Sequence, residues 1–201
     1  RLRQRLQDPL VTSSSYSSAE VKAWLAALTI TESFWNAITA ASAPELFEAG
    51  SSAMSKVLQE VIALKQLKST AVSEWPSIFS GLEVIVNRVT LSHRDPGGSA
   101  TLQDMLVSLG TGHAAKITLP DVRAELDYFP GTMLFISGLV LEHSVGPWDC
   151  GERFVIAHFM KDKVHDRMGV PRPAYPRQDY FLEMIEGDAP SKRPRKRVRR
   201  R

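Results

Sequence analysis

The stretch "SHRDPGG", residues 92–98, contains three side chains with chemical potential: His93, Arg94 and Asp95. It follows the apolar run "LEVIVNRVTL" and admits three interpretations: a kinase catalytic loop, a metal site or a polar turn. A kinase loop requires an asparagine five residues after the aspartate and an Asp-Phe-Gly motif downstream. Position 100 is alanine, no Asp-Phe-Gly occurs, and 92 upstream residues are too few for a nucleotide-binding lobe. The kinase interpretation is therefore excluded.

A metal site needs ligands that converge from different parts of the chain. His93 and Asp95 are one residue apart, so at the end of an extended strand both project to the same side. His143, inside the strand-like run "LVLEHSVG", can supply a third ligand. Two histidines and one carboxylate form the facial triad that holds Fe(II) and leaves positions open. Zinc binds the same groups, but structural zinc prefers four ligands and cysteine. A polar turn at 93–95 and a buried core histidine at 143 remain alternatives.

A possible anchor for an anionic ligand follows ten residues later. Arg153 begins the apolar run "RFVIAHF", where a guanidinium needs an anionic partner such as a ligand carboxylate. A 2-keto diacid would chelate iron through its keto acid end and reach Arg153 with its far carboxylate. Strand parity places Asn87 on the face of His93, where its amide could bind the same ligand. Alternatively, Arg153 pairs with Glu142 or Asp149, and Asn87 bonds to the backbone.

The elements that must position these residues change character once along the chain. Residues 18–68 have helical spacing, with Ser18 and Ser52 as caps and further short helices between them, interrupted by Pro44 and Gly50. From about residue 80, seven or eight short β-rich runs predict a β-sandwich or jelly roll, one face of which the helices cover. We therefore predict an α+β fold with a helical segment at 1–80, a β core at 81–170, an extension at 171–190 and a basic tail at 191–201, forming one structural domain.

The tail "SKRPRKRVRRR" dominates the charge. It holds eight of the 25 Lys and Arg residues and none of the 22 acidic residues, so the rest of the chain carries a net charge of −5 although the whole carries +3. Like charges repel, and such a run does not fold alone. It predicts a nuclear-import signal, a contact to nucleic-acid phosphates, or a passive solubilising end. Within 161–181, basic residues alternate with Tyr175 and Tyr180, which could also contact nucleic acid.

Other features limit the class of protein. Cys150 is the single cysteine, which excludes an intramolecular disulfide and a Cys-rich zinc site and fits a reducing compartment. No run of about 18 apolar residues occurs, so we expect no membrane span. The chain begins at Arg1 rather than methionine, from which we expect a segment of a longer protein. A monomer is the expected state, although no sequence feature decides it.

The segments "HRD", "YFPGTMLFISGLVLEHSV" and "GERFVIAHF" together resemble the iron and 2-oxoglutarate dioxygenases, in particular the TET/JBP-like nucleic-acid-modifying enzymes and their fungal relatives. The resemblance covers residues 82–165. It implies a double-stranded β-helix (jelly roll, cupin-like), Fe(II) bound by His93, Asp95 and His143, and 2-oxoglutarate with its distal carboxylate on Arg153. The animal TET enzymes carry a Cys-rich zinc-bound region that this chain lacks.

The resemblance also implies a substrate. It would be 5-methylcytosine or N6-methyladenine in DNA, flipped out of the helix and oxidised through a ferryl oxidant, with release of succinate and CO2. Two other functions fit the same residues: hydroxylation of a protein side chain or small molecule, and a non-catalytic member of the fold that binds DNA or a partner.

Overall fold

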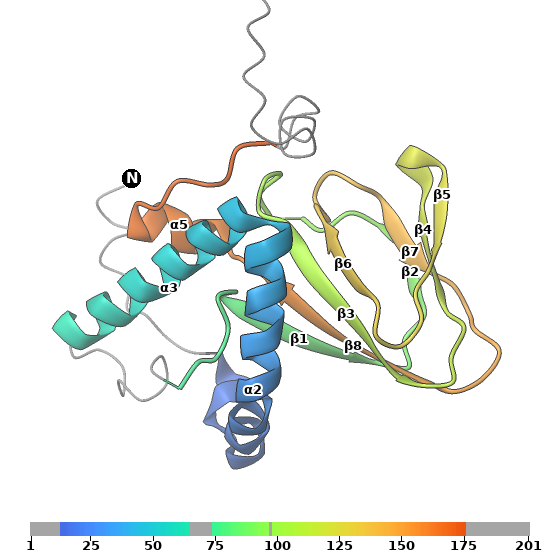
Figure 1. Ribbon diagram of the computed structural model, residues 1–201, viewed down its shortest axis with the longest axis horizontal. Coiled ribbons are helices and arrows are strands. Elements are labelled where there is room, and N and C mark those ends of the chain that lie inside the picture. The colour runs from blue at the N-terminus through green and yellow to red at the C-terminus, as the bar shows by residue number, and fades with distance from the viewer. Residues whose placement is uncertain (1–12, 65–73, 97, 176–201) are drawn as a thin grey trace, which may run out of the picture.

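The computed structural model of the 201-residue chain describes residues 13–64, 74–96 and 98–175. A short 3-10 turn, η1 (Ser14–Ser17), leads into two long helices, α2 (Ala19–Ser42) and α3 (Pro44–Leu64), and α5 (Asp162–Met168) follows the strands (Figure 1). The tail at 191–201 and most of the extension at 171–190 lie outside the described residues. The strands are β1 (Gly81–Val86), β2 (Thr90–His93), β3 (Asp104–Thr111), β4 (Lys116–Leu119), β5 (Ala124–Asp127), β6 (Met133–Ile136), β7 (His143–Val145) and β8 (Glu152–Phe159), with a 3-10 turn, η2 (Pro120–Val122), between β4 and β5.

The helices are longer than the sequence predicted. Ser18 caps α2 as expected, because its Oγ accepts a hydrogen bond from the Val21 backbone N–H at 3.1 Å. Pro44 starts α3, since a proline fits the first turn of a helix, but Gly50 does not interrupt it and Ser52 lies inside it. Gly50 is buried, and a Cβ there would overlap Met160. Close packing therefore explains this glycine better than a break does. Among the described residues, no helix is long and apolar enough to cross a bilayer.

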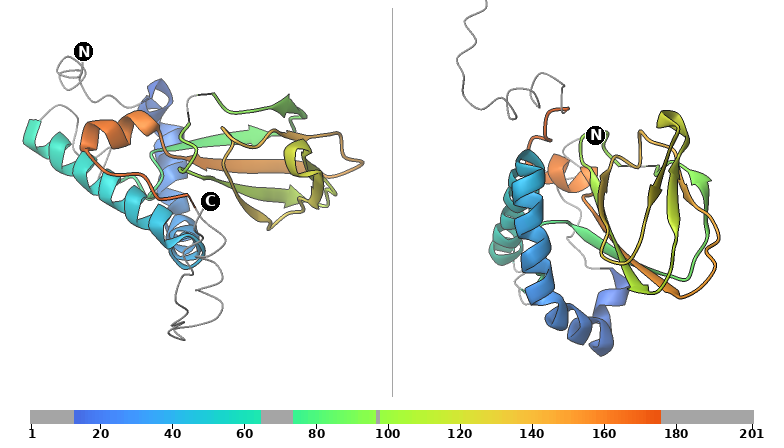
Figure 2. Two further views of the ribbon diagram at one scale, coloured as in Figure 1. Left: turned by 90° about the horizontal axis from the view of Figure 1, so that it is seen from above. Right: turned by 45° about the vertical axis from the view of Figure 1, so that its right-hand side comes forward.

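The strands form two four-stranded antiparallel sheets with the orders β1-β8-β3-β6 and β2-β7-β4-β5. They face each other, with the helices beside the first sheet (Figure 2). This arrangement confirms the predicted double-stranded β-helix with a helical layer. The run "LEVIVNRVTL" is not one strand, however, because Asn87 takes a left-handed conformation (φ 45°) and the chain passes from β1 in one sheet to β2 in the other.

Two apolar clusters hold the layers together. One lies between the helices and the first sheet and includes Trp35, Phe79, Met105 and Ile156; the other includes Ile117, Tyr128, Ile136, Val145 and Val155. The alternation along β8 connects them, because Ile156 belongs to the first cluster and Val155 to the second. The chain of β8 is therefore buried on both faces.

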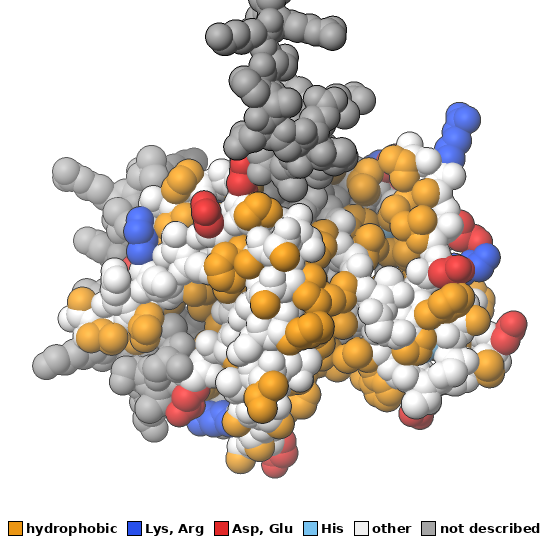
Figure 3. Space-filling view, in the orientation of Figure 1, with side chains coloured by type: hydrophobic (Ala, Val, Ile, Leu, Met, Phe, Trp, Pro, Cys, Tyr) orange, Lys and Arg blue, Asp and Glu red, His pale blue; other side chains and the backbone are white. Residues whose placement is uncertain are grey.

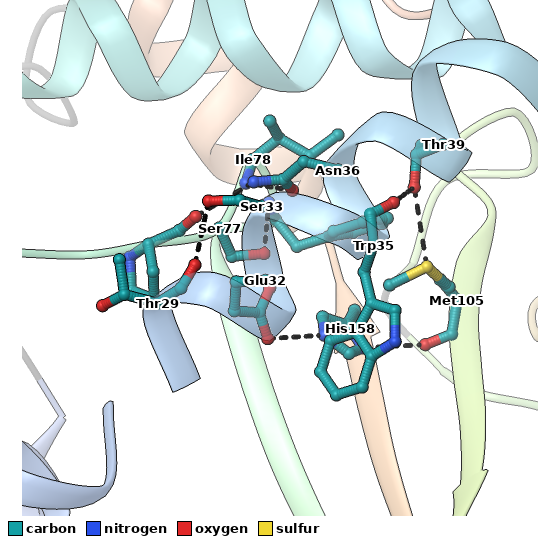
Figure 4. A network of polar contacts seen from close by, with 12 residues as sticks. Thr29, Glu32, Ser33, Trp35, Asn36, Thr39, Ser77, Ile78, Met105 and His158 are labelled. Atoms are coloured by element: carbon teal, nitrogen blue, oxygen red, sulfur yellow. Dashed lines mark hydrogen bonds and ion pairs between the residues drawn. The ribbon is translucent and has the colours of Figure 1, made fainter. Parts of the chain in front are cut away.

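A buried polar pair joins α2 to β8. His158 Nε2 lies 2.9 Å from Glu32 Oε1, and both side chains are fully buried (Figure 4). The His158 ring also contacts Trp35 edge to face, with ring centroids 5.1 Å apart. His158 thus faces the helices, on the side of β8 opposite to Arg153.

Candidate metal and ligand site

The structure brings the three expected metal ligands together where β2 and β7 pair. His93 ends β2, His143 begins β7, and the two are register partners. Asp95 follows two residues after His93, with Oδ1 3.3 Å from His93 Nε2 and Oδ2 3.7 Å from His143 Nε2. One ligand atom from each residue lies within 4.8 Å of the others. The polar-turn alternative is insufficient, because a residue fifty positions away completes the cluster.

Backbone carbonyls determine which ring nitrogen of each histidine carries the proton. His93 Nδ1 lies 2.8 Å from Leu91 O, and His143 Nδ1 lies 3.1 Å from Leu141 O. A carbonyl only accepts, so in the neutral rings Nδ1 donates and Nε2 carries a lone pair. Both lone pairs face the Asp95 carboxylate, and three acceptors therefore converge. A cation satisfies all three, and this set of ligands suits Fe(II).

The Asp95 carboxylate occupies space that only a glycine at position 138 leaves free. The Asp95 backbone N–H donates to Gly138 O at 2.8 Å, and a Cβ on Gly138 would overlap the Asp95 carboxylate. The same Cβ would lie 3.2 Å from Asp104 Oδ2. Gly138 thus allows a close approach of backbone to the candidate metal site.

Arg94 forms hydrogen bonds that connect the loops around the site. Its guanidinium donates to both carboxylate oxygens of Asp121, at 2.8 and 2.9 Å, and its Nε donates to Val140 O at 3.2 Å. Asp121 Oδ2 in turn accepts from the Glu142 backbone N–H at 2.7 Å, and Ser92 Oγ donates to Glu142 Oε1 at 2.6 Å. This network connects the segment that carries the first two ligands to the residue directly before the third.

We expect Arg94→Ala to lower the affinity for a divalent metal about tenfold, because residues that orient metal ligands contribute on that scale. The measurement is a calorimetric titration with Mn(II), a redox-stable substitute for Fe(II). Lys116→Ala is the matched control, because Lys116 forms an exposed ion pair with Glu125 at 2.7 Å in the same sheet. Equal affinities in wild type and both variants would contradict the positioning role.

Asp104, the first residue of β3, is an acidic group that the sequence did not single out. It lines the same cavity as the three ligands. Burial, and secondly the negative charge of Asp95, raise the pKa of the Asp104 carboxyl to about 7. The folded protein therefore binds this proton more tightly than the unfolded chain does.

The raised pKa makes Asp104 a source of pH-dependent instability in the metal-free protein. The folded state loses stability as the pH rises from 3.8, the ordinary value, to about 7, and the loss is complete above that. The shift in the pKa of Asp104 implies roughly 4 kcal/mol, of which we expect about half to be recovered on substitution. Asp104→Asn should therefore raise the free energy of unfolding by about 2 kcal/mol at pH 8. At pH 4 it should leave the free energy of unfolding unchanged. Urea denaturation at both pH values measures the difference. A gain of the same size at pH 4 would show that the Asp104 charge is not its cause.

A cavity of about 640 Å³ extends from the three ligands between the two sheets. Its volume suits a small molecule with part of a larger substrate. Side chains from both sheets form its apolar wall, namely Ile85, Leu106, Ile117, Val145 and Val155.

Arg153 is a buried cation in this cavity. Only 3% of the residue is exposed, its Nη1 donates to Arg88 O at 3.2 Å, and its Nε has no hydrogen-bond partner among the described residues. Its guanidinium lies over the rings of Tyr128 and Trp148, 5.2 and 5.6 Å from their centroids. Burial lowers the pKa of Arg153.

Within the part of the chain that the structure describes, Arg153 has no acidic partner. Neither Glu142 nor Asp149, the two alternatives considered from the sequence, forms an ion pair with it, and no other described acidic residue does. A buried guanidinium without a counter-ion is costly unless a ligand supplies the anion. The position of Arg153 therefore fits the prediction of a carboxylate anchor.

Asn87 does not line the cavity. Its Oδ1 accepts from the Arg153 backbone N–H at 2.8 Å, and its own N–H donates to Arg153 O at 2.8 Å. The parity argument that put Asn87 on the face of His93 is wrong, because the chain turns from one sheet to the other at this residue. The amide oxygen serves the backbone of β8, and the predicted ligand contact is not available from this position.

Comparison with known proteins identifies a family. The family model described as "Tet_JBP: Oxygenase domain of the 2OGFeDO superfamily" matches residues 3–162, which include the three ligands and Arg153. No curated protein matches the chain. Among solved structures, NgTET1 in complex with 5mC DNA is similar, with 17% sequence identity and a TM-score of 0.42. The similarity covers 64% of this chain and 50% of that one, so the present chain spans about half of that length.

Proposed function

Because this chain belongs to the TET/JBP family of oxygenase domains in the 2-oxoglutarate- and Fe(II)-dependent dioxygenase superfamily, we propose that it oxidises a methylated base in DNA. The proposed bases are 5-methylcytosine and N6-methyladenine. A methyl C–H bond, 2-oxoglutarate and O2 become a hydroxymethyl group, succinate and CO2. The observation that carries the proposal is the convergence of three acceptor atoms beside a cavity that also contains a buried guanidinium without an acidic partner among the described residues.

The donor set fits the cofactors of the superfamily. His93, Asp95 and His143 would hold Fe(II), and Arg153 would bind the distal carboxylate of 2-oxoglutarate. Together these two groups supply the oxidation of a C–H bond by O2. The protein contributes orientation: the carbonyls behind each Nδ1 hold the imidazoles in place, and the apolar wall limits access of water to the cavity.

The cavity lining also contains groups suited to a nucleotide. Phe159 ends β8 inside the cavity, and Lys161 and Lys163 follow it along the same lining. An aromatic ring can stack on a flipped base, and lysines attract phosphates. Tyr175, which the sequence suggested as a nucleic-acid contact, is half exposed, whereas Tyr180 lies outside the described residues.

The test is oxidation of defined oligonucleotides. Duplexes with 5-methylcytosine, with N6-methyladenine or without methylation are incubated with the protein, Fe(II), ascorbate and 2-oxoglutarate, and the nucleosides are analysed by mass spectrometry. We expect an oxidised base from a methylated duplex together with succinate, and neither product from His93→Ala. Metal binding without succinate release on any substrate would instead indicate a non-catalytic member of the fold.

One observation favours a second candidate, hydroxylation of a protein side chain or a small molecule. Residues 1–190 carry a net charge of −5, and on the face shown in Figure 3 the described Lys and Arg side chains lie apart from one another rather than in a cluster. DNA binding normally depends on a cluster of positive charge. The same assay with a peptide library in place of DNA distinguishes the two, because succinate release that only peptides stimulate would exclude DNA as the substrate.

We propose a nuclear location on the basis of the basic tail at 191–201, which lies outside the described residues. The same tail could contact DNA phosphates. Deleting 191–201 from a fluorescent fusion should abolish nuclear accumulation if the tail is an import signal. If it also binds phosphate, the deletion should weaken DNA binding and make it less sensitive to salt.

A further inference from the structure

Tyr128 is a buried phenol that lines the cavity beside Arg153. It follows β5 directly, and its backbone is fixed on both sides: its N–H donates to Ala115 O at 2.9 Å, and its carbonyl accepts from Ser108 Oγ at 2.9 Å. Only 1% of the residue is exposed. The ring therefore has a defined place in the lining of the cavity, where the Arg153 guanidinium lies 5.2 Å from its centroid.

Neither the phenolic O–H of Tyr128 nor the Arg153 Nε–H has an acceptor among the described residues, because the neighbouring Arg153 guanidinium can only donate to the phenolic oxygen. A buried tyrosine hydroxyl normally finds a partner, and an unpaired one costs about 1–3 kcal/mol. Burial raises the pKa of Tyr128 to about 12, although the charge of Arg153 and the contact of its guanidinium with the phenolic oxygen both act in the opposite direction. The phenol is therefore protonated at neutral pH and can donate a hydrogen bond.

Two unpaired donors in one place indicate an acceptor with several lone pairs. We propose that Tyr128 donates a hydrogen bond to the distal carboxylate of 2-oxoglutarate, next to the contact from Arg153, and so helps the site to select a 2-oxo diacid over a 2-oxo monoacid. A carboxylate has two oxygens and can accept from a guanidinium and a phenol together. This inference rests on the proposed function, because it requires that 2-oxoglutarate bind in this cavity.

The experiment compares two ligands of the same carbon skeleton. Affinities of Mn(II)-loaded protein for 2-oxoglutarate and for 2-oxovalerate, which has a methyl group in place of the distal carboxylate, are measured by calorimetry. Tyr128→Phe should weaken binding of 2-oxoglutarate about tenfold or more, as for a hydrogen bond to a charged group, and leave that of 2-oxovalerate within about twofold. Tyr175→Phe, at a half-exposed tyrosine, is the control and should change neither affinity.

Two readouts separate this role from a structural one. Removing a hydroxyl whose hydrogen has no described acceptor should leave the melting temperature of the ligand-free protein equal or higher, whereas loss of a hydrogen bond that holds the fold together would lower it. In addition, 2-oxoglutarate should change the near-ultraviolet tyrosine absorption of wild type but not of Tyr128→Phe.

The outcomes distinguish failure of this inference from failure of the proposed function. If Tyr128→Phe weakened the binding of 2-oxoglutarate and of 2-oxovalerate equally, Tyr128 would only shape the cavity, which overturns the inference. So would unchanged 2-oxoglutarate binding in Tyr128→Phe while Arg153→Lys weakens it. If wild-type protein binds Mn(II) but not 2-oxoglutarate, the proposed function fails, and the inference with it.

Discussion

Replacing Asp95 with alanine should abolish metal binding and turnover. Asp95 supplies the only negative charge among the three converging ligands, and both histidine Nε2 atoms face it. Two neutral imidazoles alone bind Fe(II) or Mn(II) weakly, so we expect the affinity to fall by about a thousandfold or more. Calorimetric titration with Mn(II) measures the affinity, and succinate release under Fe(II) and 2-oxoglutarate measures the turnover.

The matched control is Asp127→Ala. Asp127 is an exposed aspartate at the end of β5, and it is not among the residues that line the cavity. The Asp127→Ala variant should bind Mn(II) as wild type does. Asp95→Ala should also lower the pKa of Asp104, because one of the two causes of that raised pKa is removed. An Asp95→Ala protein that retains wild-type metal affinity would refute the proposed metal site.

Replacing Arg153 with alanine should weaken binding of 2-oxoglutarate about a hundredfold or more while the metal affinity stays unchanged. The reason is that no other described cation lies as deeply buried in the cavity. Arg153 is 3% exposed. The other cations of the lining, Arg88, Lys161 and Lys163, are exposed. Loss of one partner of a buried charge pair costs about 2–5 kcal/mol. Binding to the Mn(II)-loaded protein is again measured by calorimetry.

Arg153→Lys and the ligand 2-oxovalerate are the controls for this effect. Lysine keeps the charge but not the planar arrangement of donors, so its affinity for 2-oxoglutarate should lie between those of wild type and Arg153→Ala. Binding of 2-oxovalerate, which lacks the distal carboxylate, should not require Arg153. A variant that loses affinity for both ligands equally would show that the guanidinium supports the fold of the cavity rather than the carboxylate.

The parts of the site that depend on local strand geometry were predictable from the sequence. One residue of separation put His93 and Asp95 on one side of the chain, and strand alternation separated Arg153 from His158. His143 was a candidate because it lay in a strand-like run at a distance from the first pair. The fold class followed from the change from helical spacing to short β-rich runs.

The parts that depend on which strands face each other were not predictable. Tyr128 and Asp104 belong to the cavity only because β5 and β3 lie in opposite sheets around it. Asn87 was misplaced because a single left-handed residue, which the apolar pattern does not show, moves the chain between sheets. Gly50 was interpreted as a break because its close packing on Met160 is a tertiary contact.

The two candidate histidine ligands and Arg153, the proposed carboxylate anchor, lie on different sheets. His93 and His143 belong to strands of one sheet and Arg153 to a strand of the other, with Ile117 and Val155 in the layer between. The thickness of that layer consequently sets the length of a molecule that can bind the metal ligands and Arg153 at the same time. Trimming or enlarging these aliphatic side chains would alter whether a diacid of four, five or six carbons spans the gap, without a change to any group that binds it.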